Sequence, residues 1–309
     1  MNPKDITVLG IYYFLITHIY KHQNNSCRMS TTNKTNNSIA YRAIALDLDG
    51  TLMYTDHITV TEENRAALKK AHEKGASLAV ATGRTLAIIG DVCEQVPEID
   101  YVIYSNGAAV YDRRQSKNIY TECMSPDLYE PLLKKSLEIG GFVEVYIDGK
   151  DYVPKKQAET FGADFLPKEF LEKLSEQMTP IDDIIEFTKG KEIEKVTVYA
   201  TDKNDFNTLW NELSKNDEIC LASSMPVSME FTAKGVNKGS AINGMCKVLG
   251  ITADECMAFG DAGNDCEMLK YCKYSFAMAN GTDECKKSAK YETLSNAENG
   301  VAAGINRFI

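Results

Sequence analysis

Short apolar runs alternate with amphipathic stretches along most of the chain. Ala43 to Leu46 and Ser77 to Ala81 are continuous apolar runs whose length suits strands buried on both faces of a parallel sheet. Between them, Ala67, Leu68 and Ala71 form an apolar stripe at helical spacing. This order, strand then helix then strand, predicts the start of a right-handed crossover α/β unit.

The predicted helix between these two strands carries its own end signals. Thr61 can cap its first turn, and Glu62 and Glu63 suit the positive N-terminal end of a helix. Gly75 follows the last turn, where glycine commonly ends a helix.

The same rhythm returns near the C-terminus. The pattern predicts a helix over Lys238 to Leu249 that ends at Gly250, and then a strand over Cys256 to Phe259. A helix over Cys266 to Tyr271 and a strand over Ser275 to Met278 follow.

The middle of the chain has a different pattern. Phe142 to Ile147, the turn Asp148-Gly149 and Tyr152-Val153 predict a hairpin. Further elements are predicted beyond it: a strand over Lys195 to Ala200, a helix over Phe206 to Leu213, and strands near Ile219 and Val227. We therefore predict a Rossmann-like doubly wound parallel-sheet α/β core over 41–111 and 231–309, interrupted by an α+β insert over 112–230.

Residues 1–40 form a separate N-terminal segment in this division. Ile6 to Tyr20 carry no charged side chain but are shorter than the ~20 residues that cross a bilayer. Two interpretations stay open: a disordered or non-structural extension, with Met29 as an internal start, or a weak anchor or signal-like segment. Stable membrane association is not expected.

Composition removes several classes of function. The 309 residues include 34 Lys and Arg against 44 Asp and Glu, a net charge of −10, which argues against nucleic-acid binding. The nine cysteines contain no C-x-x-C pair, so neither a disulfide framework nor a zinc ribbon is indicated, and a reducing cytoplasm is the expected location. All four histidines lie at or before His72, which disfavours a Ser-His-Asp triad or a histidine-rich zinc site.

Acidic residues gather at the ends of the predicted strands. Asp47 and Asp49 follow the first strand, and Asp261 and Asp265 follow the strand near residue 258. Ligands of open parallel sheets bind beyond the carboxyl ends of strands, so these four carboxylates are expected to converge. Two carboxylates ~4 Å apart repel by ~4 kcal/mol at an effective dielectric of ~20. Such a group needs protons or a hard cation, and oxygen ligands with open positions favour Mg²⁺ beside a substrate phosphate.

Two less specific interpretations exist for these acidic residues. An EF-hand loop fails on spacing, because Gly50 stands at loop position 4 rather than 6, and Ile58 stands where a bidentate Glu belongs. Turns and helix caps are the commonest use of Asp, Gly and Thr, but they do not account for all the motifs in this order.

Four short motifs resemble those of a known family. DLDGTL at 47–52, ATGR at 81–84, GVNKG at 235–239 and GDAGND at 260–265 are similar to the ordered motifs of the haloacid dehalogenase superfamily, specifically its Cof-type phosphatases. The resemblance covers Tyr41 to Ile309. It implies that the insert is a type IIB cap, which closes over the site and chooses the leaving group.

The resemblance also implies a role for each matched residue. Asp47 would be the nucleophile that forms an aspartyl-phosphate, and Asp49 would protonate the leaving oxygen and then deprotonate water. Mg²⁺ would be bound by Asp47, the backbone carbonyl of Asp49 and Asp261, with Asp265 in support. Phosphate and substrate would be held, ordered or neutralised by Thr51, Thr82, Gly83, Arg84, Asn106, Lys238 and Asn264.

Charge arithmetic adds one expectation. Four ionised aspartates carry −4 against +2 from magnesium and +1 from Lys238, so a proton on Asp49 brings the site to neutrality. We therefore predict a raised pKa for Asp49.

Several residues keep a simpler interpretation beside the functional one. Arg84 could form a salt bridge rather than contact substrate, and Asn106 could serve its turn. Trp210 is predicted to pack in the core or between domains. The side chains of four residues could line a pocket, but their alternation is interpreted as sheet packing: Phe142, Glu144, Tyr146 and Tyr152. Cys266 and Cys272 are predicted to be buried, inert thiols.

The expected function is Mg²⁺-dependent hydrolysis of small phosphorylated metabolites, such as sugar phosphates or related monoesters. A phosphosugar mutase on the same fold and a phosphorylatable receiver-like module remain the alternatives. A non-catalytic relative is disfavoured because every motif acid is present. Neither the particular metabolite nor the oligomeric state can be read from the sequence.

Overall fold

The computed structural model describes residues 40–139, 141–158, 175–200, 202–223 and 228–309. The predicted N-terminal segment, residues 1–40, lies outside the described residues apart from Ala40. Within the described part of the chain, no helix combines the length and the apolar character that crossing a bilayer requires.

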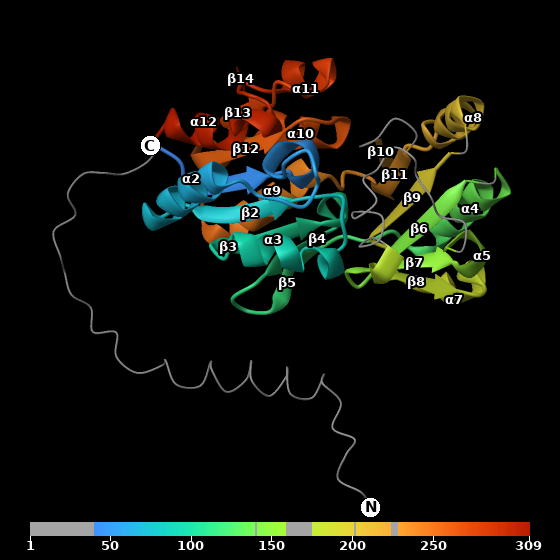
Figure 1. Cartoon of the computed structure of the whole chain (residues 1–309). Helices are drawn as coiled ribbons and strands as arrows, with labels where there is room; N and C mark the ends of the chain where they lie inside the picture. The colour runs from blue at the N-terminus through green and yellow to red at the C-terminus, as the bar shows by residue number, and fades with distance from the viewer. Residues whose placement is uncertain (1–39, 140, 159–174, 201, 224–227) are drawn as a thin grey trace, which may run out of the picture. The chain divides into compact units, whose positions relative to one another are not determined.

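The larger of two sheets, the main sheet, has eight strands in the order β14-β13-β12-β1-β2-β3-β4-β5 (Figure 1). Their bounds are β1 Ala43–Leu46, β2 Ser77–Ala81, β3 Ile99–Tyr104, β4 Ala109–Asp112, β5 Lys117–Thr121, β12 Cys256–Gly260, β13 Tyr274–Ala277 and β14 Tyr291–Glu292. Neighbours pair in parallel from β14 to β3, whereas β4 and β5 pair antiparallel at one edge. The predicted α/β fold with a doubly wound parallel-sheet core is confirmed, and two antiparallel strands, β4 and β5, extend the sheet at this edge.

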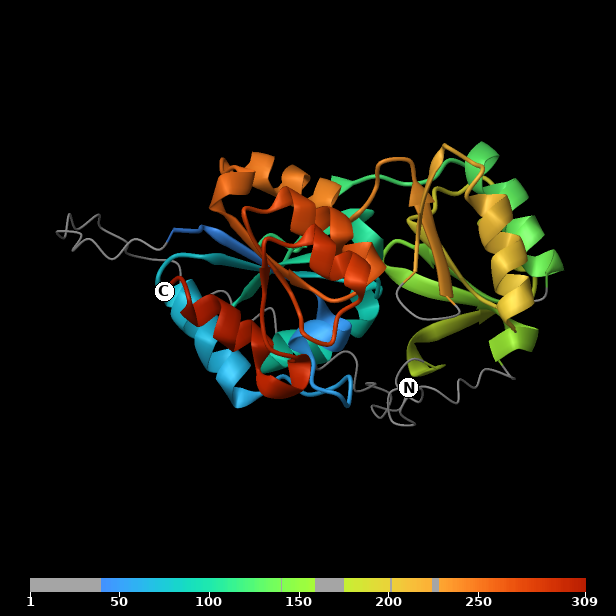
Figure 2. The same ribbon diagram turned by 90° about the horizontal axis from the view of Figure 1, so that it is seen from above.

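Helices cover both faces of the main sheet (Figure 2). The apolar cluster of one face takes in α2 (Glu62–Glu73) and α12 (Gly300–Asn306), and that of the other takes in α9 (Lys238–Leu249) and α10 (Cys266–Tyr271). Two short helices, α3 (Gly90–Gln95) and α11 (Asp283–Ser288), complete this part of the chain.

The predicted end signals of these helices act as expected. The hydroxyl of Thr61 accepts a hydrogen bond from the Asn64 amide, 3.3 Å away, and so caps α2. Gly250 ends α9 with a φ of +64°, a conformation in which other residues are strained.

The order of the main sheet reverses between β1 and β12. From β1 the chain moves outward to β2 and β3, whereas β12 and β13 lie on the other side of β1. Leu46 and Phe259 are partners in the β1–β12 register, and the Asp47 amide donates to the Phe259 carbonyl at 3.0 Å. Ligands of doubly wound sheets bind at such a reversal, beyond the carboxyl ends of the strands.

The smaller sheet, the insert sheet, has six strands in the order β10-β11-β9-β6-β7-β8. Their bounds are β6 Phe142–Ile147, β7 Lys150–Pro154, β8 Met178–Ile181, β9 Lys195–Tyr199, β10 Ile219–Ala222 and β11 Ser228–Ala233. Its helices are α4 Pro126–Glu138, α5 Lys155–Ala158, α7 Ile184–Thr188 and α8 Lys203–Leu213. We call residues 122–236, which contain these elements, the insert.

The two faces of the insert sheet differ in chemistry. Val143, Val145, Val196, Val198 and Phe231 point to one face and pack in an apolar cluster with residues of α4 and α8, which lie side by side over it (Figure 2). The intervening residues of the same strands are polar, among them Glu144, Tyr146, Lys195, Thr197 and Glu230. Because side chains alternate along a strand, these residues share the opposite face, the polar face of the insert.

The predicted limits of the insert need correction. β5 lies beyond residue 112 yet belongs to the main sheet, since its residues pair with β4. At the other end β11 runs to Ala233, past the predicted limit of residue 230, and stays in the insert sheet. Neither limit could be predicted from the sequence, because the strands on both sides of it are short and carry no motif. The division of the chain into separate domains stays a prediction.

Candidate active site

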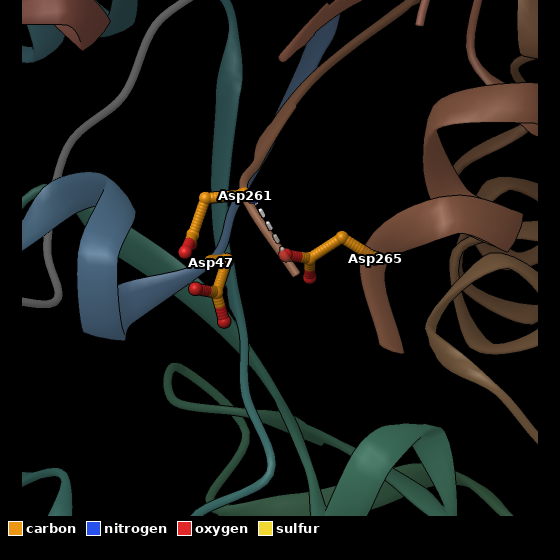
Figure 3. A group of neighbouring side chains, drawn as sticks. All are labelled: Asp47, Asp261 and Asp265. Carbon is orange, nitrogen blue, oxygen red and sulfur yellow. Dashed lines mark hydrogen bonds between the residues drawn. The ribbon is translucent and has the colours of Figure 1, made fainter. Parts of the chain in front are cut away.

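Three carboxylates converge where the main sheet reverses. Asp47 follows β1, Asp261 follows β12, and Asp265 ends the short turn Gly263–Asp265. One oxygen from each lies within 4.8 Å of the others, and Figure 3 shows the side chains of Asp47 and Asp261 side by side, with Asp265 facing them. Three of the four acids that were predicted to converge therefore form one group, and Asp49 is not part of it.

Lys238, at the first position of α9, joins two of these acids. Its Nζ donates to Asp47 Oδ1 at 2.6 Å and to Asp265 Oδ1 at 2.7 Å. The second oxygen of Asp265 accepts the backbone amides of Asp261 and Ala262 at 2.9 and 3.0 Å. Both oxygens of Asp265 are thus occupied, which leaves Asp47 and Asp261 as the acids with an oxygen to offer an ion.

The turn Leu48–Leu52, which carries the DLDGTL motif, lies against the carboxylate of Asp261. Thr51 donates from Oγ1 to Asp261 Oδ1 at 2.8 Å. Gly50 has a φ of +82°, and a Cβ at this position would collide with the Asp261 carboxylate. Glycine and threonine in this motif therefore allow the close approach of β1 and β12 loops.

Electrostatics explain what this group of acids needs. Burial raises the pKa of Asp47 well above its usual range, and the charge of Asp265 raises it further. Burial and then Asp265 raise the pKa of Asp261 to about 7. Burial would lower the pKa of Lys238, but the charges of Asp265 and Asp47 raise it above its usual range. The group carries more negative charge than one lysine compensates, so its residues fit a divalent cation bound by oxygen.

Asp49 has a different environment. Its carboxylate accepts from Arg84 Nε at 2.8 Å and Arg84 Nη2 at 2.6 Å, and it lies 2.9 Å from His57 Nδ1. Although burial favours the neutral acid, the charge of Arg84 and the hydrogen bonds of His57 and Arg84 lower the pKa of Asp49 below its usual range. The predicted raised pKa is therefore wrong for this arrangement, because the charge count had not paired Asp49 with a cation.

Some of the predicted site residues line the cavity beside these acids, and others do not. This cavity, of about 230 Å³, is lined by Asp47, Asp49, Thr82, Gly83, Arg84, Asp261 and Asn264 of the predicted set. Thr51, Asn106, Lys238 and Asp265 are not among its lining residues; all four are buried. Lys238 therefore contacts Asp47 without lining the cavity.

Asn106 bridges the two sheets. It adopts a φ of +55° in the turn Ser105–Gly107, so the simple turn role fits. Its Oδ1 also accepts from Asn264 Nδ2 at 3.1 Å, and its Nδ2 donates to Glu230 of the insert. Asn106 thus links the last acidic motif to β11.

Most residues of the cavity's second wall were not predicted as site residues. That wall is formed by residues of the polar face of the insert, Glu144, Tyr146, Lys195, Thr197, Tyr199 and Glu230, together with Asp151 of β7 and Gln177. Glu144 and Tyr146 were interpreted as sheet packing and instead line the cavity, whereas Tyr152 packs on Phe187 with ring centroids 4.7 Å apart. The available signal was a polar residue at every second position of three strands.

Two insert contacts reach the main sheet directly. Lys195 Nζ donates to the Gly83 carbonyl at 2.6 Å, and Ser105 Oγ donates to Glu194 Oε2 at 2.9 Å. A Cβ on Gly83 would lie 3.0 Å from Asn106 Oδ1 and 3.2 Å from Glu230 Oε2. Glycine in the ATGR motif therefore lets the insert approach.

The residues predicted to be structural behave as such. Cys266 and Cys272 are buried, at 4% and 0% exposure. Trp210 stacks on Phe206, with centroids 5.5 Å apart, and packs against the apolar cluster of the insert. The eight cysteines in the described part of the chain are free thiols.

Comparisons with known proteins agree with this geometry. A family model described as haloacid dehalogenase-like hydrolase matches residues 44–305. The chain is similar to the 5-amino-6-(5-phospho-D-ribitylamino)uracil phosphatase YcsE of Bacillus subtilis, with 29% identity over 268 residues that cover 87% of this chain and 96% of that protein.

Solved structures give the same fold. A HAD/COF-like hydrolase from Plasmodium vivax is similar with a TM-score of 0.74 and 28% identity, covering 88% of this chain and 96% of the other. A haloacid dehalogenase-like hydrolase from B. subtilis has a TM-score of 0.76 at 24% identity and covers 87% of this chain and 100% of the other, a likeness of fold.

Proposed function

The chain belongs to the haloacid dehalogenase-like hydrolase family and is a phosphatase of its Cof type, and from this premise we propose that it hydrolyses small phosphorylated metabolites with Mg²⁺. The observation that carries the proposal is the group of the buried Asp47 and Asp265 and the partly buried Asp261 beside a cavity, in which Lys238 donates to Asp47 and Asp265. YcsE is named for a small phosphorylated substrate, which supports the class of substrate proposed.

Asp47 is the proposed nucleophile. A carboxylate oxygen of Asp47 bonds to phosphorus in line with the ester oxygen, and the bond between phosphorus and that ester oxygen breaks. Lys238, which donates to Asp47 Oδ1, fixes the orientation of the carboxylate and balances its charge. The product of this step is a phosphoryl group bonded to Asp47 and an alcohol that needs one proton.

Asp49 is the proposed proton carrier. It gives its proton to the leaving oxygen; a water then attacks phosphorus, returns a proton to Asp49, and frees Asp47 and inorganic phosphate. The Arg84 ion pair holds Asp49 in the ionised form that the second step uses. A phosphate dianion entering the cavity competes for Arg84, and release of Asp49 from that pair is what allows it to carry a proton in the first step.

The metal proposal follows from the donor set. Asp47 and Asp261, with Asp265 behind them, are the residues that would hold the ion, and hard oxygen ligands without imidazole suit Mg²⁺. When bound, Mg²⁺ would offset the negative charge of the carboxylates and of the phosphate oxygens. Thr82 and Gly83, which line the same cavity, are the proposed phosphate contacts.

The insert is proposed to act as a cap over this site. Its polar face supplies the second wall of the cavity, and Lys195 and Glu230 reach Gly83 and Asn106. Closure of this wall would exclude water from the nucleophile and select the leaving group.

The direct test is release of inorganic phosphate from p-nitrophenyl phosphate. We expect turnover with Mg²⁺, its loss with EDTA, and recovery when excess Mg²⁺ is restored. Asp47→Asn should lower kcat by about 10⁴-fold or more, as loss of a catalytic nucleophile does. The matched control is Asp254→Asn, the same change on a side chain that is 78% exposed. Parental turnover in Asp47→Asn, or phosphate moved within a sugar without release, would contradict the proposal.

A further inference from the structure

The polar face of the insert places three carboxylates and one lysine against the cavity. Glu144, Asp151, Glu230 and Lys195 are each 6% exposed or less, and all four line the cavity. In the strand register Asp151 is opposite Tyr146 and Tyr146 opposite Lys195, while Glu144 is opposite Thr197 and Thr197 opposite Glu230. Paired residues of adjacent strands share a face, so the charged groups form two neighbouring rows.

The lysine of this group is engaged with one of the acids. Lys195 Nζ lies 3.2 Å from Glu230 Oε2 and 2.6 Å from the Gly83 carbonyl, and it sits 4.3 Å from the centre of the Tyr146 ring. Glu230 also accepts from the Asn106 amide. Lys195 and Glu230 thus form a charge-balanced pair that ties the insert to the main sheet.

Among the residues that the structure describes, neither Glu144 nor Asp151 forms an ion pair, although the charge of Lys195 acts on both. Glu144 Oε2 accepts from the hydroxyls of Tyr146 and Tyr199, at 2.5 and 3.4 Å. Asp151 Oδ1 is buried and accepts no hydrogen bond from any residue that the structure describes. Burial and then the charge of Glu144 raise the pKa of Asp151, which means that the two carboxylates lie close enough to repel each other.

A buried polar atom without a partner costs about 1–3 kcal/mol, and more when it is charged. Structures retain such atoms where a ligand supplies the missing partner. Asp151 lines the same cavity as Asp47, so we assign the missing donor to a molecule bound there beside the nucleophile. In a phosphatase, that position is taken by the leaving group.

The negative charge of the cavity indicates which kind of leaving group it can bind. The phosphoryl group brings negative charge into a cavity whose second wall already holds two carboxylates that form no ion pair within the described part of the chain. A hydroxyl group can donate one hydrogen bond but leaves that repulsion in place, whereas an ammonium group donates up to three and cancels one charge. Building on the proposed function, we propose that the preferred substrates are phosphate monoesters whose leaving group carries a protonated amine, held by Asp151 and Glu144.

The test compares esters that differ only in this group. O-phosphoethanolamine is paired with 2-hydroxyethyl phosphate, and glucosamine 6-phosphate with glucose 6-phosphate, so that two sizes of leaving group are covered. The measured quantity is the amine preference, which is the kcat/KM of the ammonium ester divided by that of its hydroxyl partner. We expect an amine preference of about tenfold or more in at least one pair, the effect of one charge-assisted contact.

Variants of the two acids make the test specific. Asp151→Asn keeps the size of the side chain and removes its charge, so the amine preference should fall toward one; Glu144→Gln should lower it in the same direction. Because the preference is a ratio within one variant, partial loss of folded protein cancels from it. The matched control is Asp182→Asn, the same change on an insert side chain that is 87% exposed, and it should keep the parental ratio.

The outcomes separate this inference from the function on which it rests. Hydrolysis of p-nitrophenyl phosphate together with an amine preference of one or less in both pairs overturns the inference alone. An amine preference that Asp151→Asn and Glu144→Gln both leave unchanged also overturns it, because the amine is then recognised elsewhere. Absence of hydrolysis of every ester with Mg²⁺ overturns both.

Discussion

The main sheet and the insert sheet each bury a group of acids around one lysine, and the two groups are built differently. In the first, Lys238 donates to Asp47 and Asp265, two backbone amides donate to the second oxygen of Asp265, and Thr51 donates to Asp261. In the second, Lys195 pairs with Glu230 and reaches across to a backbone carbonyl of the main sheet. The first group is complete within one part of the fold, whereas the second depends on contact between two parts. The group around Lys238 suits a reaction step that all members of a family share. The group around Lys195 suits selection among substrates.

The largest expected effect comes from removing the lysine of the first group. Lys238→Met leaves Asp47 and Asp265 buried without their cation, and breaking a buried pair in this way costs about 3–5 kcal/mol. We expect loss of phosphatase activity and a fall of that size in the free energy of unfolding, measured by urea denaturation. Lys270→Met, at a side chain that is 55% exposed, is the control and should change little. Equal stability of the two variants would show that Lys238 does not compensate the acids.

Addition of Mg²⁺ should stabilise the first group and not the second. Binding to the folded state alone contributes about 2.7 kcal/mol at a concentration 100 times the dissociation constant. We expect the urea midpoint of the parent protein to rise with MgCl₂ and to stay constant with KCl at equal ionic strength. Asp261→Asn should remove most of this rise, since it removes one of the two acids proposed to hold the ion. A full rise in that variant would place the ion elsewhere.

Removing the lysine of the second group should have a smaller effect. Lys195→Met deprives Glu230 of its ion pair, but Glu230 keeps the Asn106 amide as a donor, so we expect a loss of about 2 kcal/mol. The same variant loses the bond to the Gly83 carbonyl, and KM for p-nitrophenyl phosphate should rise more than kcat falls. Lys234→Met is the control, because Lys234 pairs with Glu218 on the surface. If Lys195→Met lowered the free energy of unfolding as much as Lys238→Met does, the proposed difference between the two groups would be contradicted.

The smallest effect is a pH dependence of stability at the contact between the parts. Burial, the main cause, raises the pKa of Glu194 above its usual value of 4.5. The folded protein then holds this proton more tightly than the unfolded chain does, so the contribution of Glu194 to stability is fully present below pH about 4.5 and is lost as the pH rises through the folded pKa. Glu194→Gln should therefore gain stability relative to the parent as the pH rises above about 4.5.

Urea denaturation across a pH series measures this difference. Glu192→Gln makes the same change at an exposed neighbour and should show no such trend. A stability difference between Glu194→Gln and the parent that is flat with pH would contradict the assignment. Glutamine has one acceptor oxygen and keeps only one of the two bonds from Ser105 and the Gly149 amide, a loss that does not vary with pH, so the pH trend reports the charge.

Many strands and helices of the fold could be predicted from the local pattern of apolar and polar residues. The runs at Ala43–Leu46 and Ser77–Ala81 are strands, and Thr61 caps the helix between them, because buried strands and amphipathic helices leave periods of their own in a sequence. The hairpin around Asp148-Gly149 is also present, with a positive φ at both turn residues. The antiparallel edge strand β5 was not predicted, since its half-exposed residues carry no clear period.

What the sequence determined by itself is the set of motif acids, since Asp47, Asp49, Asp261 and Asp265 stand in short contiguous runs at strand ends, where chain order alone implies a shared edge. What only the tertiary structure decided is which groups face one another across that edge. It paired Asp49 with Arg84 and His57, and it brought the polar face of the insert, with Asp151, to the cavity that Asp47 also lines. Those partners come from strands and loops far apart in the chain, and their distances and desolvation depend on packing that no local pattern encodes.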